Sequence, residues 1–397
     1  MLQNENRERI AIVGTLAETM VGFRGELIKH LVGKGHEVFA IAAGHTNETK
    51  AQIEALGATP LNYNLEQFGL NPFKELRAVW QLKALFRQYR ISVVLSYFAK
   101  PSIYGTLAAW LARVPHRVAK IEGLGRIFTD DIRPMNPTLE QRYRHAKKLW
   151  IRTAMVRLYK LSLPKAQHVV FLNHDDKHEL IQNYGVKIAK STVIGGIGVC
   201  LQHYATTLAP VEPFRFIFVG RLLNEKGIRE YLGAAEHLKA KYPEVEFWVL
   251  GQPDTNRFAI TPQELNAYVE RGIVEYPGKV ANVVPFLQQS SVFVLPSYYR
   301  EGVPRSTQEA LAVGRAVITT NMPGCKDTVE QNRNGVLIEP RNQNALAQAM
   351  EQLIQNPEQV QKMGLESRTL ATMRFDVRKI NETLEHLIIP ENRDEPL

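Results

Sequence analysis

The chain has 397 residues, which is enough for two ordinary domains of roughly 100–200 residues each. Its 45% apolar and 22% charged residues are typical of a soluble globular protein that buries full hydrophobic cores. The net charge is +9. The chain has two cysteines, Cys200 and Cys325, which are too few for a disulfide framework or a four-ligand zinc site. We therefore expect a reducing, cytoplasmic setting.

The amino-terminal residues are polar and lack a basic region followed by an apolar core, so we expect no signal peptide. The longest candidate for a membrane span, residues 91–112, is interrupted by Lys100 and Pro101. No apolar stretch therefore reaches the roughly 18–20 residues that a span requires. The protein is expected to be soluble, and contact with a membrane surface stays open.

The first half of the chain alternates short β-branched runs with helical patterns. We expect strands at residues 9–14, 36–42, 91–97, 117–121 and 168–172, and helices at 22–33, 49–56, 72–89, 102–112, 138–162 and from 175 onward. Strands that alternate with helices of about 10–15 residues predict a parallel sheet covered on both faces. The continuous apolar runs fit strands that are buried on both sides.

The pattern breaks at residues 201–213, a polar, proline-containing stretch that we interpret as a linker. A second series follows, with strands at 215–219, 246–250, 292–295 and 316–319 and helices at 227–241, 305–313 and 342–355. A last amphipathic helix is expected at 375–388, before a frayed end at 390–397. The prediction is an α/β protein with two doubly wound, Rossmann-like domains, 1–205 and 206–374, facing each other across a ligand-binding cleft, and a final segment at 375–397.

The strongest motif occupies residues 297–311, where a strand leads into a loop with Glu301 and Gly302 and a helix starts near Pro304. The backbone N–H groups and positive end of that helix predict a diphosphate site. Glu301 and Glu309 cannot bind phosphate, but they can accept hydrogen bonds from the vicinal hydroxyls of a hexose and a ribose. The alternative, that Glu309 faces solvent on an ordinary helix, is disfavoured by this context.

A second motif follows the strand at 215–219, where Gly220, Arg221 and Lys226 share one loop. Two cations at the carboxyl end of a strand suit a pyrophosphate leaving group, whose developing charge they neutralise. The alternative, a surface arginine and lysine at a helix start, is less attractive because cations oppose the helix dipole there.

These two motifs, Gly220-Arg221 with Glu225-Lys226-Gly227 and the Glu301/Glu309 pair, resemble glycosyltransferase family 4, which has the GT-B fold and retains anomeric configuration. The resemblance implies that Arg221 and Lys226 hold the donor diphosphate, that Glu301 binds the donor sugar and that Glu309 binds the ribose. It also implies that Gly220, Gly302, Val303 and Pro304 line this site, and that the last helix crosses back onto the first domain.

A narrower resemblance comes from residues 121–129, 170–176, 251–254 and 295–305, which are similar to a bacterial branch of the family. That branch transfers hexoses or N-acetylhexosamines onto undecaprenyl-diphosphate-linked sugars, for polysaccharides or protein glycans. The resemblance implies a UDP-sugar as donor substrate and a polyprenyl-diphosphate-linked acceptor. Retention without an obvious carboxylate nucleophile points to a front-face mechanism, in which the acceptor hydroxyl passes its proton to the departing phosphate.

Glu122 departs from the family pattern, because many members place a histidine at the end of the corresponding strand. A carboxylate there can accept a hydrogen bond from a sugar hydroxyl, or act as a base if its pKa is raised. The Glu-Gly-Leu-Gly context favours a site role over a structural one, so Glu122 joins Arg221, Lys226 and Glu301 as a candidate catalytic residue.

Gly14 and Thr15 are weaker candidates for substrate binding, in a loop expected after the first strand that extends to Gly22 and Gly25. Their spacing does not fit the G-x-G-x-x-G fingerprint, which counts against a nicotinamide enzyme, and simple turn glycines are an equal alternative. The adjacent pairs Asp130-Asp131 and Asp175-Asp176 have diverging side chains, and we interpret the second pair as helix capping. We predict no required metal and no cofactor.

Residues 126–165 carry ten lysines and arginines against three acidic residues, and thus most of the excess charge. Clustered basic charge attracts anionic lipid, nucleic acid or phosphorylated substrates, and a merely solvated basic helix is an equal alternative. We expect this segment to bind the inner face of the cytoplasmic membrane. Two rival functions are a sugar-nucleotide-modifying enzyme, such as an epimerase on a related fold, and a nucleic-acid-binding protein, for which no recognition motif is found.

Overall fold

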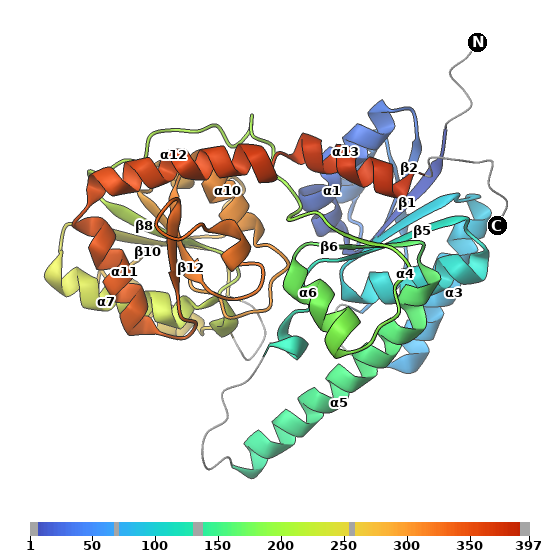
Figure 1. The fold of residues 1–397 in the computed structure, drawn as a ribbon, viewed down its shortest axis with the longest axis horizontal. Helices are drawn as coiled ribbons and strands as arrows, with labels where there is room; N and C mark the ends of the chain where they lie inside the picture. Colours follow the sequence, from blue (N-terminus) through green and yellow to red (C-terminus); the bar gives the residue numbers. More distant parts are fainter. Residues whose placement is uncertain (1–6, 67–70, 130–137, 254–258, 390–397) are drawn as a thin grey trace. The chain divides into compact units, whose positions relative to one another are not determined.

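The computed structural model describes residues 7–66, 71–129, 138–253 and 259–389, drawn as the coloured ribbon in Figure 1. The chain divides into two compact units. Unit 1 comprises Met1–Ile194 together with Arg378–Leu397, and unit 2 comprises Gly195–Val377. The aspartate pair at 130–131 and the end of the chain at 390–397 lie outside the described residues.

The described part of unit 1 is built on a seven-stranded parallel sheet with the order β3-β2-β1-β4-β5-β6-β7. Its strands are β1 (Arg9–Leu16), β2 (Glu37–Ala43), β3 (Thr59–Asn62), β4 (Val93–Tyr97), β5 (His116–Ile121), β6 (His168–Phe171) and β7 (Ser191–Val193). The central strands β1 and β4 are buried almost throughout, as their continuous apolar runs require. The strand order reverses between them, the point at which doubly wound sheets open a ligand crevice.

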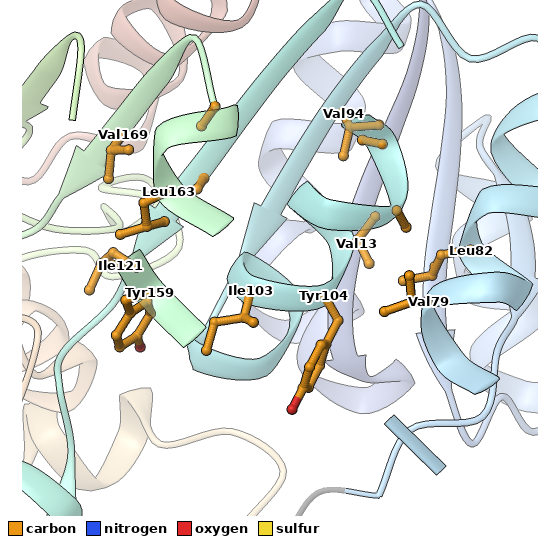
Figure 2. Close-up of a cluster of buried hydrophobic side chains, with 14 of the residues drawn as sticks. Val13, Val79, Leu82, Val94, Ile103, Tyr104, Ile121, Tyr159, Leu163 and Val169 are labelled. Carbon is orange, nitrogen blue, oxygen red and sulfur yellow. The ribbon is translucent and has the colours of Figure 1, made fainter. Parts of the chain in front are cut away.

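Helices cover both faces of this sheet. They are α1 (Ala17–Gly33), α2 (Asn47–Ala55), α3 (Pro72–Gln88), α4 (Ala99–Ala112), α5 (Leu139–Ser162), α6 (His174–His178) and the final α13 (Val377–Ile388). On one face, Val79 and Leu82 of α3, Ile103 of α4 and Tyr159 of α5 converge on strand residues such as Val94 (Figure 2). On the other face, α1 and the buried Ile380, Leu384 and Ile388 of α13 form a second core.

Unit 2 repeats the plan with a six-stranded parallel sheet, β10-β9-β8-β11-β12-β13, among its described residues. Its strands are β8 (Arg215–Val219), β9 (Glu246–Leu250), β10 (Glu275–Gly278), β11 (Val292–Leu295), β12 (Ala316–Thr320) and β13 (Gly335–Ile338). Its helices are α7 (Ile228–Lys241), α8 (Pro262–Glu270), α9 (Val284–Gln288), α10 (Arg305–Val313), α11 (Gln343–Ile354) and α12 (Pro357–Arg374). The predicted pair of doubly wound α/β units is confirmed.

The unit boundary lies earlier in the chain than the expected 205/206 junction. Val199 pairs with Asp376 in an isolated parallel bridge, and the hydroxyl of Tyr204 reaches Glu309, so this stretch belongs with unit 2. At the other end the unit boundary follows Val377, and the rest of α13 belongs to unit 1. There His30 contacts Glu385 at 2.6 Å, beside the apolar side of the helix.

Candidate functional site

The cations predicted to bind a diphosphate follow β8 in unit 2. Gly220 and the exposed Arg221 leave the strand, a single 3₁₀ turn (Asn224–Lys226) follows, and α7 begins at once. A side chain at Gly227, whose φ is +80°, would overlap the carbonyl of Pro296. Only glycine permits this close approach without strain. The backbone of the loop after β8 therefore packs against the end of β11, and Lys226 lies next to that strand.

Lys226 and Glu301 are in direct contact through Nζ and Oε1. The hydroxyl of Ser297 also donates to Glu301 Oε1 at 3.1 Å, and the N–H groups of Tyr298 and Tyr299 donate to the carbonyl of Glu225 at 2.8 and 2.9 Å. Since β8 and β11 are parallel neighbours, their carboxyl ends meet at one edge of the sheet. The structure thus joins the two sequence motifs through an ion pair between their central residues.

A turn at Gly324 packs against the backbone of the loop that carries Glu301. A side chain at Gly324, whose φ is +79°, would overlap the carbonyls of Glu301 and Gly302. The next residue, Cys325, is fully buried, and burial, followed by the nearby Glu301 charge, raises the pKa of its thiol to about 12. Cys325 is therefore a neutral packing residue and is not a nucleophile at neutral pH.

Glu309 is buried on α10, which excludes the solvent-facing alternative. Its Oε1 accepts hydrogen bonds from the hydroxyl of Tyr204 at 2.7 Å and from Nε of Arg305, one helical turn earlier, at 2.8 Å. Burial, together with the Glu309 charge, raises the pKa of Tyr204, so its hydroxyl stays a donor. These two donors hold the carboxylate in one orientation.

The remaining predicted residues of unit 2 form the frame of this region. The N–H of Gly220 donates to the carbonyl of Leu250 at 3.0 Å, which ties the loop after β8 to the end of β9. Gly302, Val303 and Pro304 are buried and lead into α10, where Pro304 precedes the first helical residue and no side chain caps the helix. The first N–H groups of α10 thus lie one turn beyond Glu301, as the motif predicts.

The loop predicted after the first strand is absent from the described residues of unit 1, and that prediction is wrong. Gly14 and Thr15 lie within β1, and α1 starts at Ala17, directly after the strand. A side chain at Gly14 would overlap the hydroxyl end of Tyr97 on β4, and its carbonyl accepts from Tyr63 at 2.9 Å. Gly14 is therefore required for packing between adjacent strands.

Glu122 follows β5 and belongs to a buried cluster of charges that the sequence did not reveal. Its Oε1 contacts a terminal nitrogen of Arg24 from α1 and lies 2.9 Å from Nζ of Lys120. The Arg24 guanidinium in turn stacks over the ring of Tyr97, 4.1 Å from its centroid. Only 2%, 1% and 4% of the Arg24, Lys120 and Glu122 side chains are exposed.

The charges of this cluster decide its protonation. Burial alone would raise the pKa of Glu122, but Arg24 and Lys120 together outweigh it and hold that pKa below its usual value. Burial, reinforced by Arg24, lowers the pKa of Lys120 to about 8. A base role for Glu122 required a raised pKa. The carboxylate is instead an ionised hydrogen-bond acceptor.

The described aspartate pair, Asp175-Asp176, lies at the start of α6. The cap of α6 is Asn173, whose side chain accepts from the N–H of Asp176 at 2.7 Å, while Asp175 and Asp176 occupy the first turn. The two aspartates do lie at the start of a helix, as the capping interpretation requires, but the residue that caps the helix is Asn173 and not an aspartate. In the part of the chain that the structure describes, no three His, Cys, Asp or Glu side chains are grouped as metal ligands. No described helix is long and apolar enough to cross a membrane.

Several polar partners in these sites were missed by the sequence analysis. Arg305 stands four residues before Glu309, a spacing that places the two side chains on one helix face and could have been used. Lys120 stands two residues before Glu122, a local spacing that could also have been used. Tyr204 and Arg24 reach their partners from distant parts of the chain, and no local pattern signals such contacts.

The chain matches two family models. Residues 25–196 match the model described as "Glycosyltransferase Family 4", and residues 213–356 match "Glycosyl transferases group 1". One model thus falls largely on each unit, and together they span most of the chain.

Two curated relatives match nearly the full length. The chain is 27% identical over 361 residues to the N,N'-diacetylbacillosaminyl-diphospho-undecaprenol alpha-1,3-N-acetylgalactosaminyltransferase of Campylobacter jejuni, covering 88% of this chain and 90% of the relative. It is 23% identical over 392 residues to the capsular polysaccharide biosynthesis glycosyltransferase CapM of Staphylococcus aureus, covering 96% of each.

Solved structures share the fold. The sucrose-phosphate synthase of Thermosynechococcus elongatus superposes with a TM-score of 0.75 at 18% identity, covering 96% of this chain and 98% of the other. HepE of Anabaena, solved in complex with UDP and glucose, gives a TM-score of 0.73 at 17% identity, covering 95% and 98%. The predicted two-domain GT-B fold is confirmed by these matches together with the two parallel sheets.

Proposed function

The chain belongs to glycosyltransferase family 4, and from that premise we propose that it moves a hexose or N-acetylhexosamine from a UDP-sugar to an undecaprenyl-diphosphate-linked sugar, with retention of anomeric configuration, in polysaccharide or protein-glycan synthesis. The observation that carries the proposal is the Lys226–Glu301 contact at the shared edge of β8 and β11. It supplies a cation for a phosphate and a carboxylate for sugar hydroxyls at one point.

The relatives support the substrate classes. The name of the Campylobacter jejuni enzyme describes transfer of N-acetylgalactosamine onto a diphospho-undecaprenol-linked sugar, and the HepE structure contains UDP and glucose. Uridine as the base and a galactose, N-acetylgalactosamine or N-acetylglucosamine donor are therefore our first choices.

The donor would replace the Lys226–Glu301 contact with two others. Lys226 and Arg221 would bind the diphosphate, and Glu301 would accept hydrogen bonds from the sugar hydroxyls. Before the donor binds, Lys226 and Glu301, whose side chains are only 14% and 11% exposed, compensate each other's charge. Glu309, oriented by Tyr204 and Arg305, would accept from the ribose hydroxyls.

The proposed reaction proceeds on one face of the sugar. The acceptor oxygen forms a bond to the anomeric carbon, the bond from that carbon to the diphosphate oxygen breaks, and the acceptor proton passes to this departing oxygen. The protein orients both substrates and stabilises the charge on the leaving group through Lys226 and Arg221. Glu122, held ionised by Arg24 and Lys120, would accept a hydrogen bond from a substrate hydroxyl.

A substrate panel tests this function. UDP-glucose, UDP-galactose and their N-acetylamino counterparts are each incubated with a short polyprenyl-diphosphate sugar, and the anomer of the product is read by NMR. We expect one donor to give an α-linked product that retains configuration. Inversion would refute the front-face mechanism, and donor turnover without acceptor would favour the epimerase alternative. A gel shift with nucleic acid is expected to show no binding.

We propose that α5 brings the enzyme to the anionic inner leaflet. The amino-terminal half of this helix, including Leu139, Tyr143 and Trp150, is exposed and projects from the body of unit 1 (Figure 1). Its basic side chains fit an anionic surface. Lys148 and Arg152 also donate to backbone carbonyls of residues 129 and 127, so their reversal would alter the fold locally.

Reversal of charges at the exposed end of α5 gives a cleaner test. Arg142→Glu with Lys147→Glu should weaken binding to phosphatidylglycerol vesicles, and added salt should weaken binding of the parent protein in the same way. Unchanged, salt-insensitive binding would remove α5 as the electrostatic contact. The matched control is Lys362→Glu on α12 in unit 2.

A further inference from the structure

Exposed apolar side chains are concentrated on one side of unit 1. Among the described residues, fifteen large hydrophobic side chains are exposed, and nine of them lie on α3, α4 and α5. These three helices pack on the same face of the seven-stranded sheet and around one core. Their outer surfaces thus form one continuous side of the unit, of which α5 is only one part.

On α3 the exposed residues form a stripe, which we call the α3 stripe: Phe73, Leu76 and Trp80, exposed by 82%, 56% and 52%. Their spacing of three and four residues places them on one face of the helix. The opposite face buries Val79, Leu82 and other residues in the core. An ordinary surface helix needs one apolar face, so this second face is unexplained by the packing of unit 1.

Basic side chains surround the stripe. Lys74, Arg77, Lys83 and Arg87 are the cations of α3, and Lys83 Nζ lies 4.1 Å from the centre of the Trp80 ring. The acid of this helix, Glu75, is buried and bonded to Lys100 at 2.5 Å, and of the four cations Lys74 contacts the exposed Glu66. The neighbouring α4 adds the exposed Trp110, with Lys165 Nζ 4.7 Å from its ring.

Aromatic side chains interleaved with lysine and arginine suit the boundary between headgroups and acyl chains. Rings enter the boundary, while the long basic side chains extend to anionic phosphates. We propose that the α3 stripe, together with Trp110, inserts into the headgroup region of an anionic phospholipid bilayer. This inference rests on the proposed lipid-linked acceptor, because an enzyme whose acceptor is anchored in a bilayer needs a surface that holds it there.

The test compares a double variant, Phe73→Ser with Trp80→Ser, against a matched control, Leu365→Ser with Met373→Ser, two exposed residues of α12 in unit 2. Cosedimentation with phosphatidylglycerol vesicles should fall about tenfold or more for the first variant, because two large apolar side chains no longer enter the bilayer. The control should bind like the parent. Trp80→Phe should bind with only a small loss and should reduce the blue shift of tryptophan emission on adding vesicles.

Activity separates this inference from the proposed function. On a short-chain, water-soluble acceptor the double variant should keep the parent rate, whereas on acceptor embedded in vesicles its rate should fall with its binding. Parental vesicle binding by Phe73→Ser/Trp80→Ser would overturn the inference. So would a change in its sedimentation coefficient without loss of vesicle binding, which would identify a protein contact. A parent enzyme inactive on both acceptors would refute the proposed function. The comparison of vesicle binding between the variants would still test the membrane contact of the α3 stripe, because it does not depend on activity.

Discussion

Replacing Glu122 by glutamine should destabilise unit 1 strongly. The carboxylate is the only acidic partner that the structure describes for Arg24 and Lys120 within this cluster, and all three side chains are almost fully buried. Glutamine keeps the size of the side chain but leaves two neighbouring cations without compensating charge. Breaking a buried ion pair by removing one partner costs about 3–5 kcal/mol. For a unit of this size, that corresponds to a fall in melting temperature of roughly 10 °C.

The pH dependence of this loss follows from Lys120. The pKa of Lys120 in the folded protein is about 8, below the ordinary lysine value of 10.5, so the unfolded state binds more protons between those values and stability rises with pH there. In the Glu122→Gln variant Lys120 loses the attraction of Glu122, which raises its pKa in the parent. The pH range over which stability rises with pH therefore extends to lower values. The difference in unfolding free energy between parent and variant should therefore narrow as pH rises toward about 8 and stay constant above it, where Lys120 has lost its proton in both folded proteins.

Urea unfolding followed by circular dichroism at several pH values measures this effect. Glu26→Gln on α1 is the control, since the Glu26–Lys29 pair is exposed and its loss should change stability by less than about 0.5 kcal/mol. Adding Lys120→Met to Glu122→Gln removes one of the two stranded cations and should recover part of the loss. If Glu122→Gln unfolds within about 1 kcal/mol of the parent, the three charges are not a coupled buried cluster.

Three further predictions concern the proposed donor site and the strand that carries Gly14. Lys226→Ala and Arg221→Ala should each lower kcat by roughly 30- to 1000-fold, equivalent to about 2–4 kcal/mol of barrier, with KM changed much less; near-parental turnover in steady-state assays would remove them from the leaving-group role. Tyr204→Phe should raise KM for the sugar nucleotide by about fivefold, since Glu309 loses one orienting donor worth about 1 kcal/mol; an unchanged KM would argue against ribose binding by Glu309. Gly14→Ala should cost about 1–3 kcal/mol in urea unfolding because the added methyl group overlaps Tyr97, and parental stability would show that Tyr97 can move.

The buried strands of both units were predictable because a strand covered on both faces is a continuous apolar run. β8, β9 and β11 begin and end at the predicted residues. The missed strands are short or polar and lie at or near sheet edges, as in β3 with the sequence TPLN and β10 with EYPG. Half-exposed strands of this length carry no pattern that distinguishes them from loops.

α12 was missed for a different reason. It packs on α10 partly through small residues, and a side chain at Gly364 would overlap the carbonyl of Gly314. Where two backbones approach closely, glycine and serine occupy positions that would otherwise carry large apolar side chains. The hydrophobic pattern of this helix is therefore weak, although its inner face is buried.

The donor motifs were predictable in their order along the chain, but their pairing was not. The spacing of Glu301 and Glu309 indicated a loop and a helix, and the structure has both. The contact between Lys226 and Glu301 joins residues 75 positions apart. It depends on Gly227 lying against Pro296, a tertiary contact. Such residues can therefore be named from the sequence more easily than their partners can.

Glu122 stands where many family members place a histidine, and neighbouring residues of the fold stabilise its charge. A carboxylate this deeply buried would ordinarily take up a proton. Here Arg24 approaches from α1 and Lys120 from β5, the strand that Glu122 directly follows, and their charges keep the carboxylate ionised. The same cations limit what Glu122 can do, since a carboxylate stabilised as an anion is a weak proton acceptor. If Glu122 touches substrate, it therefore acts through hydrogen bonding and charge, and proton transfer is left to the departing phosphate.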